Sequence, residues 1–144
     1  LQAMVLTKEE KMVLTPTYHV FEMFSVHQDA TLLPLGVESD LRCGPNGNEL
    51  PALSLSGSRD QEGKVHLSLV NIHPEEDLKM VLDVRGRDFT GVSGRILTSD
   101  RLSGHNTFED PEAVKPEEYK GFKAGKDGIE LKLPARSVLV LEIN

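Results

Sequence analysis

Residues 128–144, GIELKLPARSVLVLEIN, contain two short runs in which side chains of alternating character follow one another. In the first run, 129–133 (IELKL), apolar residues alternate with charged ones. In the second run, 139–143 (LVLEI), every odd position is Leu or Ile. Successive side chains of a β-strand point to opposite faces, so this period of two predicts two strands, each with one buried and one wetter face.

The same alternation recurs upstream, at residues 53–56 (LSLS), 65–69 (VHLSL) and 80–84 (MVLDV). Turn-forming residues separate the runs, at 44–48 (GPNGN), 60–63 (DQEG), 73–77 (HPEED) and 126–128 (KDG). Short strands spaced in this way are typical of antiparallel sheets. We therefore predict a mainly β fold, an antiparallel β-sandwich of jelly-roll-like form. A βαβ layout would need helical patterns between the strands, and none follows Val26.

One helix is predicted before the strands. The pair Thr15-Pro16 suits a helix start, because threonine can cap the first turn and proline fits the first helical position. Val20, Phe21 and Phe24 then fall on one helical face. The sequence therefore predicts a short helix at about 16–27, ahead of the sandwich.

Composition excludes several classes of function. The chain of 144 residues has 16 basic and 23 acidic residues, a formal charge of −7, and nucleic-acid phosphates would repel it. No apolar run approaches the roughly 18–20 residues of a membrane span. The single cysteine, Cys43, excludes an internal disulfide and a cysteine-based zinc site. We expect no nucleic-acid or membrane partner and no cofactor.

The start of the chain favours the interpretation of an internal segment. It begins at Leu1, without a basic stretch followed by an apolar one. We therefore expect no signal peptide here and expect Leu1 to lie within a longer protein. Nothing in the sequence assigns a cellular compartment.

Residues 99–125 interrupt the regular spacing of the strands. Loops longer than about 12–15 residues are uncommon in compact domains and are often functional. Within this one, His105 lies near Glu109 and Asp110. Loop hydrogen bonding is the favoured interpretation of this cluster, and a metal site is the alternative.

We expect this long loop to be ordered, because His105 and Asn106 can bond backbone groups and apolar side chains can anchor it. Phe108, Val114 and Tyr119 are the side chains that could pack against the sheet. Phe108 is predicted to be the buried anchor.

No pattern of nucleophilic catalysis is present. Residues 55–58 (LSGS) form an ordinary passage from strand to turn rather than a G-x-S-x-G elbow, and their hydroxyls are predicted to lie on the surface. His66 is predicted on the outward face of its strand.

A pair of glycosidase carboxylates would lie about 5–10 Å apart, whereas acids such as 75–77 (EED) fall in predicted turns. A solvated acidic surface is the favoured interpretation.

Aromatic residues give weak support to sugar binding. Sugar-binding modules offer exposed rings to the apolar faces of sugars. This chain has no tryptophan, two tyrosines and five phenylalanines. A carbohydrate-binding module for plant cell-wall polysaccharide is therefore the alternative function, with Tyr119 and Phe122 as its first candidate contacts.

Distinctive segments run through the chain: 1–7 (LQAMVLT), 12–21 (MVLTPTYHVF), 26–30 (VHQDA), 67–71 (LSLVN), 94–98 (GRILT), 105–111 (HNTFEDP) and 133–141 (LPARSVLVL). Together they resemble the α-L-arabinofuranosidases of glycoside hydrolase family 51. The resemblance lies where the catalytic barrel of those enzymes runs into a C-terminal β-sandwich.

The resemblance implies a parent enzyme that hydrolyses terminal α-L-arabinofuranosyl residues from arabinose-containing polysaccharides. In the family, two glutamates on barrel strands catalyse the reaction with retention, and they would lie before Leu1. The dipeptide Asn48-Glu49 is a chance match to the family's Asn-Glu motif. No catalytic, cofactor-binding or metal residue is therefore transferred, and this chain alone is expected to be inactive.

The resemblance also implies a division of the chain and its partners. Residues 1–28 would be the end of the barrel and 29–144 the C-terminal β-sandwich. The implied partner is the catalytic barrel of the same parent chain, and the polysaccharide is the parent's substrate. Without the barrel, we expect apolar side chains of 1–14 to pack on the sandwich or to drive self-association. These side chains are Met4, Val5, Leu6, Met12, Val13 and Leu14.

Overall fold

A computed structural model describes residues 3–45, 47–86, 89–125 and 128–144. The predicted fold class is confirmed, since the described residues are mainly β with antiparallel pairing and one short α-helix. Of the predicted turns, 44–48 and 126–128 include positions outside the described residues, namely 46 and 126–127.

The helical segment comprises α1 (Pro16–Phe24) and the 3₁₀ turn η1 (Ser25–His27). The strands of the described chain are, in order, β1 (Val5–Lys8), β2 (Lys11–Leu14), β3 (Thr31–Leu32), β4 (Arg42–Cys43), β5 (Leu50–Pro51), β6 (Leu53–Arg59), β7 (Val65–Asn71), β8 (Leu78–Leu82), β9 (Val92–Thr98), β10 (Glu117–Glu118), β11 (Phe122–Gly125), β12 (Gly128–Leu133) and β13 (Ser137–Ile143).

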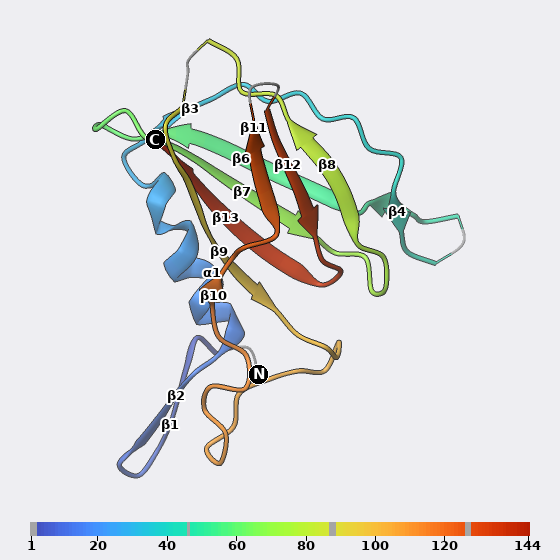
Figure 1. Cartoon of the computed structure of the whole chain (residues 1–144). Helices are drawn as coiled ribbons and strands as arrows, with labels where there is room; N and C mark the ends of the chain where they lie inside the picture. The colour runs from blue at the N-terminus through green and yellow to red at the C-terminus, as the bar shows by residue number, and fades with distance from the viewer. Residues whose placement is uncertain (1–2, 46, 87–88, 126–127) are drawn as a thin grey trace.

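Two sheets of the described chain form a sandwich (Figure 1). The large sheet has the order β10-β9-β13-β7-β6-β3, and the small sheet has the order β11-β12-β8. β13 lies at the centre of the large sheet and pairs along its whole length with both β7 and β9. Two further antiparallel pairs, β1-β2 and β4-β5, stand apart from these sheets.

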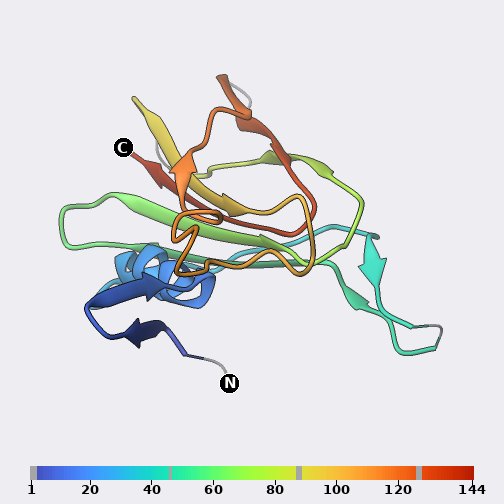
Figure 2. The ribbon, with the colours of Figure 1, turned by 90° about the horizontal axis from the view of Figure 1, so that it is seen from below.

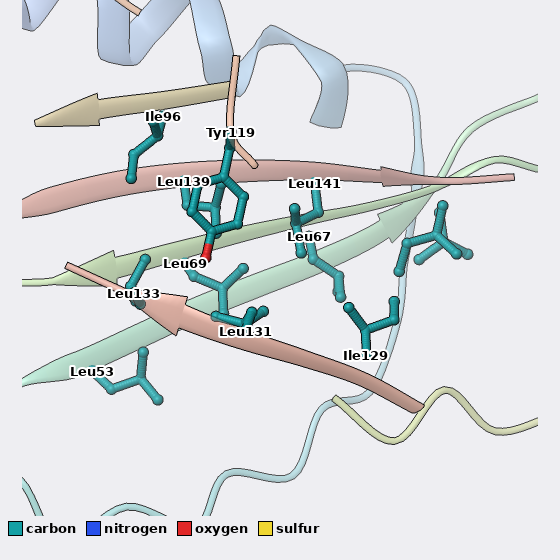
Figure 3. Packing of buried hydrophobic residues seen from close by; sticks show 12 residues of the cluster. Leu53, Leu67, Leu69, Ile96, Tyr119, Ile129, Leu131, Leu133, Leu139 and Leu141 are labelled. Carbon is teal, nitrogen blue, oxygen red and sulfur yellow. The ribbon is translucent and has the colours of Figure 1, made fainter. Parts of the chain in front are cut away.

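The main core fills the space between the two sheets (Figure 3). The alternation that predicted the strands also selects the buried side chains: Ile129, Leu131 and Leu133 come from the small sheet, and Leu139, Leu141 and Ile143 face them from β13. Tyr119 lies with this cluster. Burying such a side chain completely stabilises the fold by roughly 1.5–3 kcal/mol, so the sandwich has a substantial core of its own.

The helix covers the outer face of the large sheet (Figure 2). It begins as predicted, because the side chain of Thr15 accepts a hydrogen bond from the backbone N–H of Tyr18 and Pro16 is the first helical residue. Met23 is buried in a second cluster with Leu97 and Val140 of the sheet. The outer face of this sheet is therefore a second apolar interface rather than a solvated surface.

The strands β1 and β2 form a hairpin beside the helix (Figure 2). Its base is fastened by Thr15, whose hydroxyl donates to the carbonyl of Ala3 and whose N–H donates to the carbonyl of Met4. Val13 is buried, whereas Met12 is 63% exposed. The hairpin thus packs through one side only.

Candidate functional site

The structure places the predicted cluster of the long loop on the surface. His105 and both acids, Glu109 and Asp110, are exposed. His105 Nδ1 lies 2.8 Å from the carbonyl oxygen of Ser103, a contact within the loop itself. No group of three or more His, Cys, Asp or Glu side chains is arranged to hold a metal ion in the described residues. The cluster therefore gives no support to the alternative of a metal site.

The loop is anchored differently from the prediction. Phe108 is half-buried rather than buried, whereas Asn106 is 4% exposed. The Asn106 amide donates to the carbonyls of Leu14 (2.8 Å) and Val114 (2.9 Å), and its oxygen accepts from the Val114 N–H (2.7 Å). Val114 itself is buried against the helix, as one of the predicted anchors. The expected backbone bonds of Asn106 thus join the loop to the hairpin, whereas the prediction of Phe108 as the buried anchor was wrong.

Tyr119 is not a platform for sugars. Its ring is buried in the core, and its hydroxyl lies 2.7 Å from the Gly121 carbonyl and also bonds the Lys132 carbonyl. Burial raises the pKa of this phenol. Phe122 lies beside it, with ring centroids 6.0 Å apart, and is half-buried. Of the two predicted contacts, Tyr119 is therefore unavailable to a ligand.

Of the hydroxyls expected on the surface at 55–58, Ser56 is exposed, whereas Ser58 belongs to a buried polar cluster. Ser58 is buried, and its Oγ lies 2.6 Å from His27 Nδ1. His27 Nε2 lies 2.6 Å from the Oγ of Ser68 on the neighbouring strand. The histidine ring of η1 is thereby held between two serines of the sheet, which fixes the end of the helical segment.

His66 lies on the face of β7 away from the main core, as predicted, but this face is covered and the side chain is buried. Its Nε2 lies 2.9 Å from Asp60 Oδ2, and the histidine holds the pKa of this carboxyl below its usual value. Among the described residues its Nδ1 has no hydrogen-bond partner.

This cluster does not form a nucleophilic triad. Both nitrogens of His27 are bonded to serines, while the carboxylate of Asp60 bonds the other histidine. Ser58 and Ser68 are both buried, so neither hydroxyl is accessible to a substrate. Burial, and secondarily the nearby His66, lowers the pKa of His27, which favours its neutral form. The arrangement fits a structural role.

The carboxylates also lack the environment of a glycosidase pair. A general acid needs a raised pKa, whereas the pKa of Asp77 is lowered by its hydrogen bond to Lys132. Lys115 lowers the pKa of Glu112 in the same way. Glu49, in the chance Asn-Glu dipeptide, is exposed in the turn before β5. These acids carry ion pairs or solvent-exposed charge.

Exposed apolar side chains gather instead on the hairpin and helix. We call this the hairpin–helix face; it comprises Met4, Val5, Met12 and Phe21. Phe21 and Met12 are each 63% exposed. On the helix, Phe21 points away from the sheet cluster that contains Met23. Exposed large apolar side chains on neighbouring elements make this face a candidate interaction site.

Comparison with known proteins identifies the domain. The sequence model of the family described as "Alpha-L-arabinofuranosidase C-terminal domain" matches residues 1–137. The chain belongs to this family. An intracellular exo-α-L-arabinofuranosidase of Bacteroides ovatus is 38% identical over 143 residues, which is 99% of this chain and 28% of that protein.

Solved structures agree with this family assignment. The GH51 arabinofuranosidase from Xanthomonas axonopodis pv. citri is 35% identical, with a TM-score of 0.94 over 100% of this chain and 29% of its own. AbfB, a family 51 α-L-arabinofuranosidase from Bifidobacterium longum, shares the fold at 21% identity and a TM-score of 0.86, over 99% of this chain and 28% of its own. The arabinofuranosidase C-terminal domain described here thus spans less than a third of these relatives.

No helix in the described part of the chain is long and apolar enough to cross a membrane.

Proposed function

We propose that this chain is the C-terminal, non-catalytic domain of an enzyme that hydrolyses terminal α-L-arabinofuranosyl residues from arabinose-containing polysaccharides. Its role is structural: it supports a catalytic domain of the same parent chain. The names of the relatives and the small share of their length that this chain covers support the proposal.

The hairpin–helix face is the observation that carries the structural role. Phe21 and Met12 expose large apolar side chains. The helix that carries Phe21 is nevertheless packed on the sandwich through Met23. We infer that residues 1–28, the end of the catalytic barrel in the family resemblance, face the catalytic domain. Covering these side chains would add hydrophobic stabilisation that the isolated domain cannot obtain.

A chimera tests this docking. This chain replaces the corresponding 143 residues of the Bacteroides ovatus relative, and the chimera is compared with its Phe21→Asp variant. The control is Leu50→Asp on β5, because Leu50 is 63% exposed and matches the 63% of Phe21. We expect Phe21→Asp to lower the temperature at which the chimera loses activity, whereas Leu50→Asp leaves it unchanged. Equal effects of the two substitutions would contradict the docking.

The isolated chain tests the absence of catalysis. We expect no turnover of an aryl α-L-arabinofuranoside by the purified 144-residue protein. Hydrolysis that disappears in a Glu109→Gln variant would show that the chain carries its own active site, and the proposal would then be wrong.

A further inference from the structure

The outer face of the small sheet carries a shallow groove of about 500 Å³. It crosses all three strands of that sheet as described, on the side opposite the core. The charged and exposed apolar residues that matter here are Lys79, Val81, Lys120, Lys123, Glu130 and Lys132. Four lysines and one glutamate thus line the groove, in a chain whose acidic residues outnumber its basic ones by 23 to 16.

Two of these lysines are available to a ligand. Lys132 pairs with Asp77 at 2.8 Å and Lys120 pairs with Glu118 at 3.0 Å. Within the described residues, no ion pair is formed by Lys79 or Lys123, and both side chains are exposed. Lys123 lies directly opposite Glu130 in the β11-β12 register, so the positive charge without close compensation is chiefly that of Lys79.

The pairing of the strands brings the positive charges together. Lys79 of β8 lies directly opposite Lys132 of β12 in the antiparallel register. Like charges at directly opposed positions destabilise a sheet. Local arrangements that cost stability are often found at functional sites. Asp77 compensates the charge of Lys132 in part, and a bound anion would relieve the repulsion that remains from Lys79.

Apolar surface lies within the same groove. Val81, on this outer face of β8, is 62% exposed. Apolar side chains can pack against the C–H faces of sugar rings, while lysines bind carboxylates as point charges. The groove therefore combines the two kinds of contact that an acidic sugar chain requires.

We propose that this groove binds saccharide chains that carry carboxylates, of the uronic-acid type. The inference rests on the proposed function in one respect, namely that the parent enzyme acts on polysaccharide. Carboxylates along one chain engage several lysines together, so the groove holds the acidic backbone or side branches of the polymer. The contact would tether the enzyme to acidic regions of its substrate.

Titration calorimetry with a galacturonate oligomer tests the proposal on the 144-residue chain. A neutral arabinose oligomer of equal length and a polyglutamate peptide serve as comparison ligands. We expect galacturonate to bind, and to bind more weakly as salt is raised, because salt screens exposed charges. The variant Lys79→Gln/Lys123→Gln should weaken binding at least about threefold, since exposed ion pairs contribute modestly.

The matched control is Lys8→Gln/Lys11→Gln. These lysines also lie directly opposite each other, but in the β1-β2 hairpin, away from the groove (Figure 1). The control changes the net charge equally and should leave binding intact. Lys79→Gln alone should keep or raise the unfolding temperature, because it removes the repulsion from Lys132.

Several outcomes would overturn the inference: no binding of galacturonate, an equal loss in the control variant, or equal binding of the neutral oligomer. Equally tight binding of polyglutamate would assign the groove to an acidic protein segment instead. Each of these results leaves the docking of the hairpin–helix face standing, because the chimera measures Phe21 on a different surface.

Discussion

Replacing Asn106 by alanine should destabilise the domain by about 2–4 kcal/mol. The side chain is 4% exposed and makes three hydrogen bonds, at 2.7, 2.8 and 2.9 Å. Alanine would leave the buried N–H of Val114 without its acceptor, which costs about 1–3 kcal/mol. The carbonyls of Leu14 and Val114 lose a donor each, at a smaller cost because a carbonyl has a second lone pair.

Urea unfolding followed by circular dichroism measures this loss. We expect the midpoint to fall while the slope stays constant, which indicates lower stability without a change in the surface exposed on unfolding. The matched control is Asn48→Ala, in an exposed turn. Asn106→Asp should cost more than alanine, because a carboxylate would face two carbonyl oxygens. A loss below about 1 kcal/mol for Asn106→Ala would refute the role of Asn106 as the anchor.

Three further predictions concern the pH dependence of stability, the ring of Phe108 in the long loop, and self-association of the chain. The pKa of folded His27 lies below its unfolded value, so the stability this group contributes is present above about pH 6.5 and declines as pH falls through its folded pKa. The lowered pKa of Asp60 acts in the same direction at lower pH, and a urea midpoint that rises on acidification from pH 7.5 to 5.5 would contradict this sign. Phe108→Ala should cost about 1–2 kcal/mol in the same urea assay, less than the 3–5 kcal/mol typical of a fully buried ring. In sedimentation equilibrium, any dimer of the isolated chain should shift towards monomer in Phe21→Asp; a dimer unaffected by this change would place the contact elsewhere.

The sequence predicted the sandwich because its signal is local. In 129–133 and 139–143 the alternation identifies which side chains enter the core, and the structure buries those residues. The helix start at Thr15-Pro16 is likewise encoded in adjacent residues, since a cap acts within one turn. Features of this kind need no knowledge of distant parts of the chain.

The buried polar cluster could not be predicted in this way. Alternation in β7 correctly placed His66 on the face away from the main core, but it could not show that this face is covered. The cover comes from η1, where His27 is 41 residues from its partner Ser68. A sequence signal did exist: Val138 and Val140 are apolar at outward positions of β13, as expected for a strand covered on both faces.

The prediction of Phe108 as the buried anchor was wrong for a related reason. The size and apolar character of Phe108 favoured it as the buried residue, yet burial depends on the surface that is available nearby. Asn106 is buried because carbonyls from Leu14 and Val114 converge on its amide, and Leu14 is 92 residues away in the chain. Such convergence of distant backbone groups leaves no pattern in the neighbouring sequence.

The central position of β13 has a consequence for synthesis on the ribosome. Until residues 137–143 have left the exit tunnel, β9 and β10 on one side and β7, β6 and β3 on the other have no strand to join them. The nascent chain therefore carries two incomplete pieces of sheet with open edges, which are prone to pair with other chains. Closure also requires contacts between residues as far apart as Val65 and Ile143, and such long-range pairing is slow. We expect this domain to acquire its fold late, and a chaperone that shields strand edges to raise its yield.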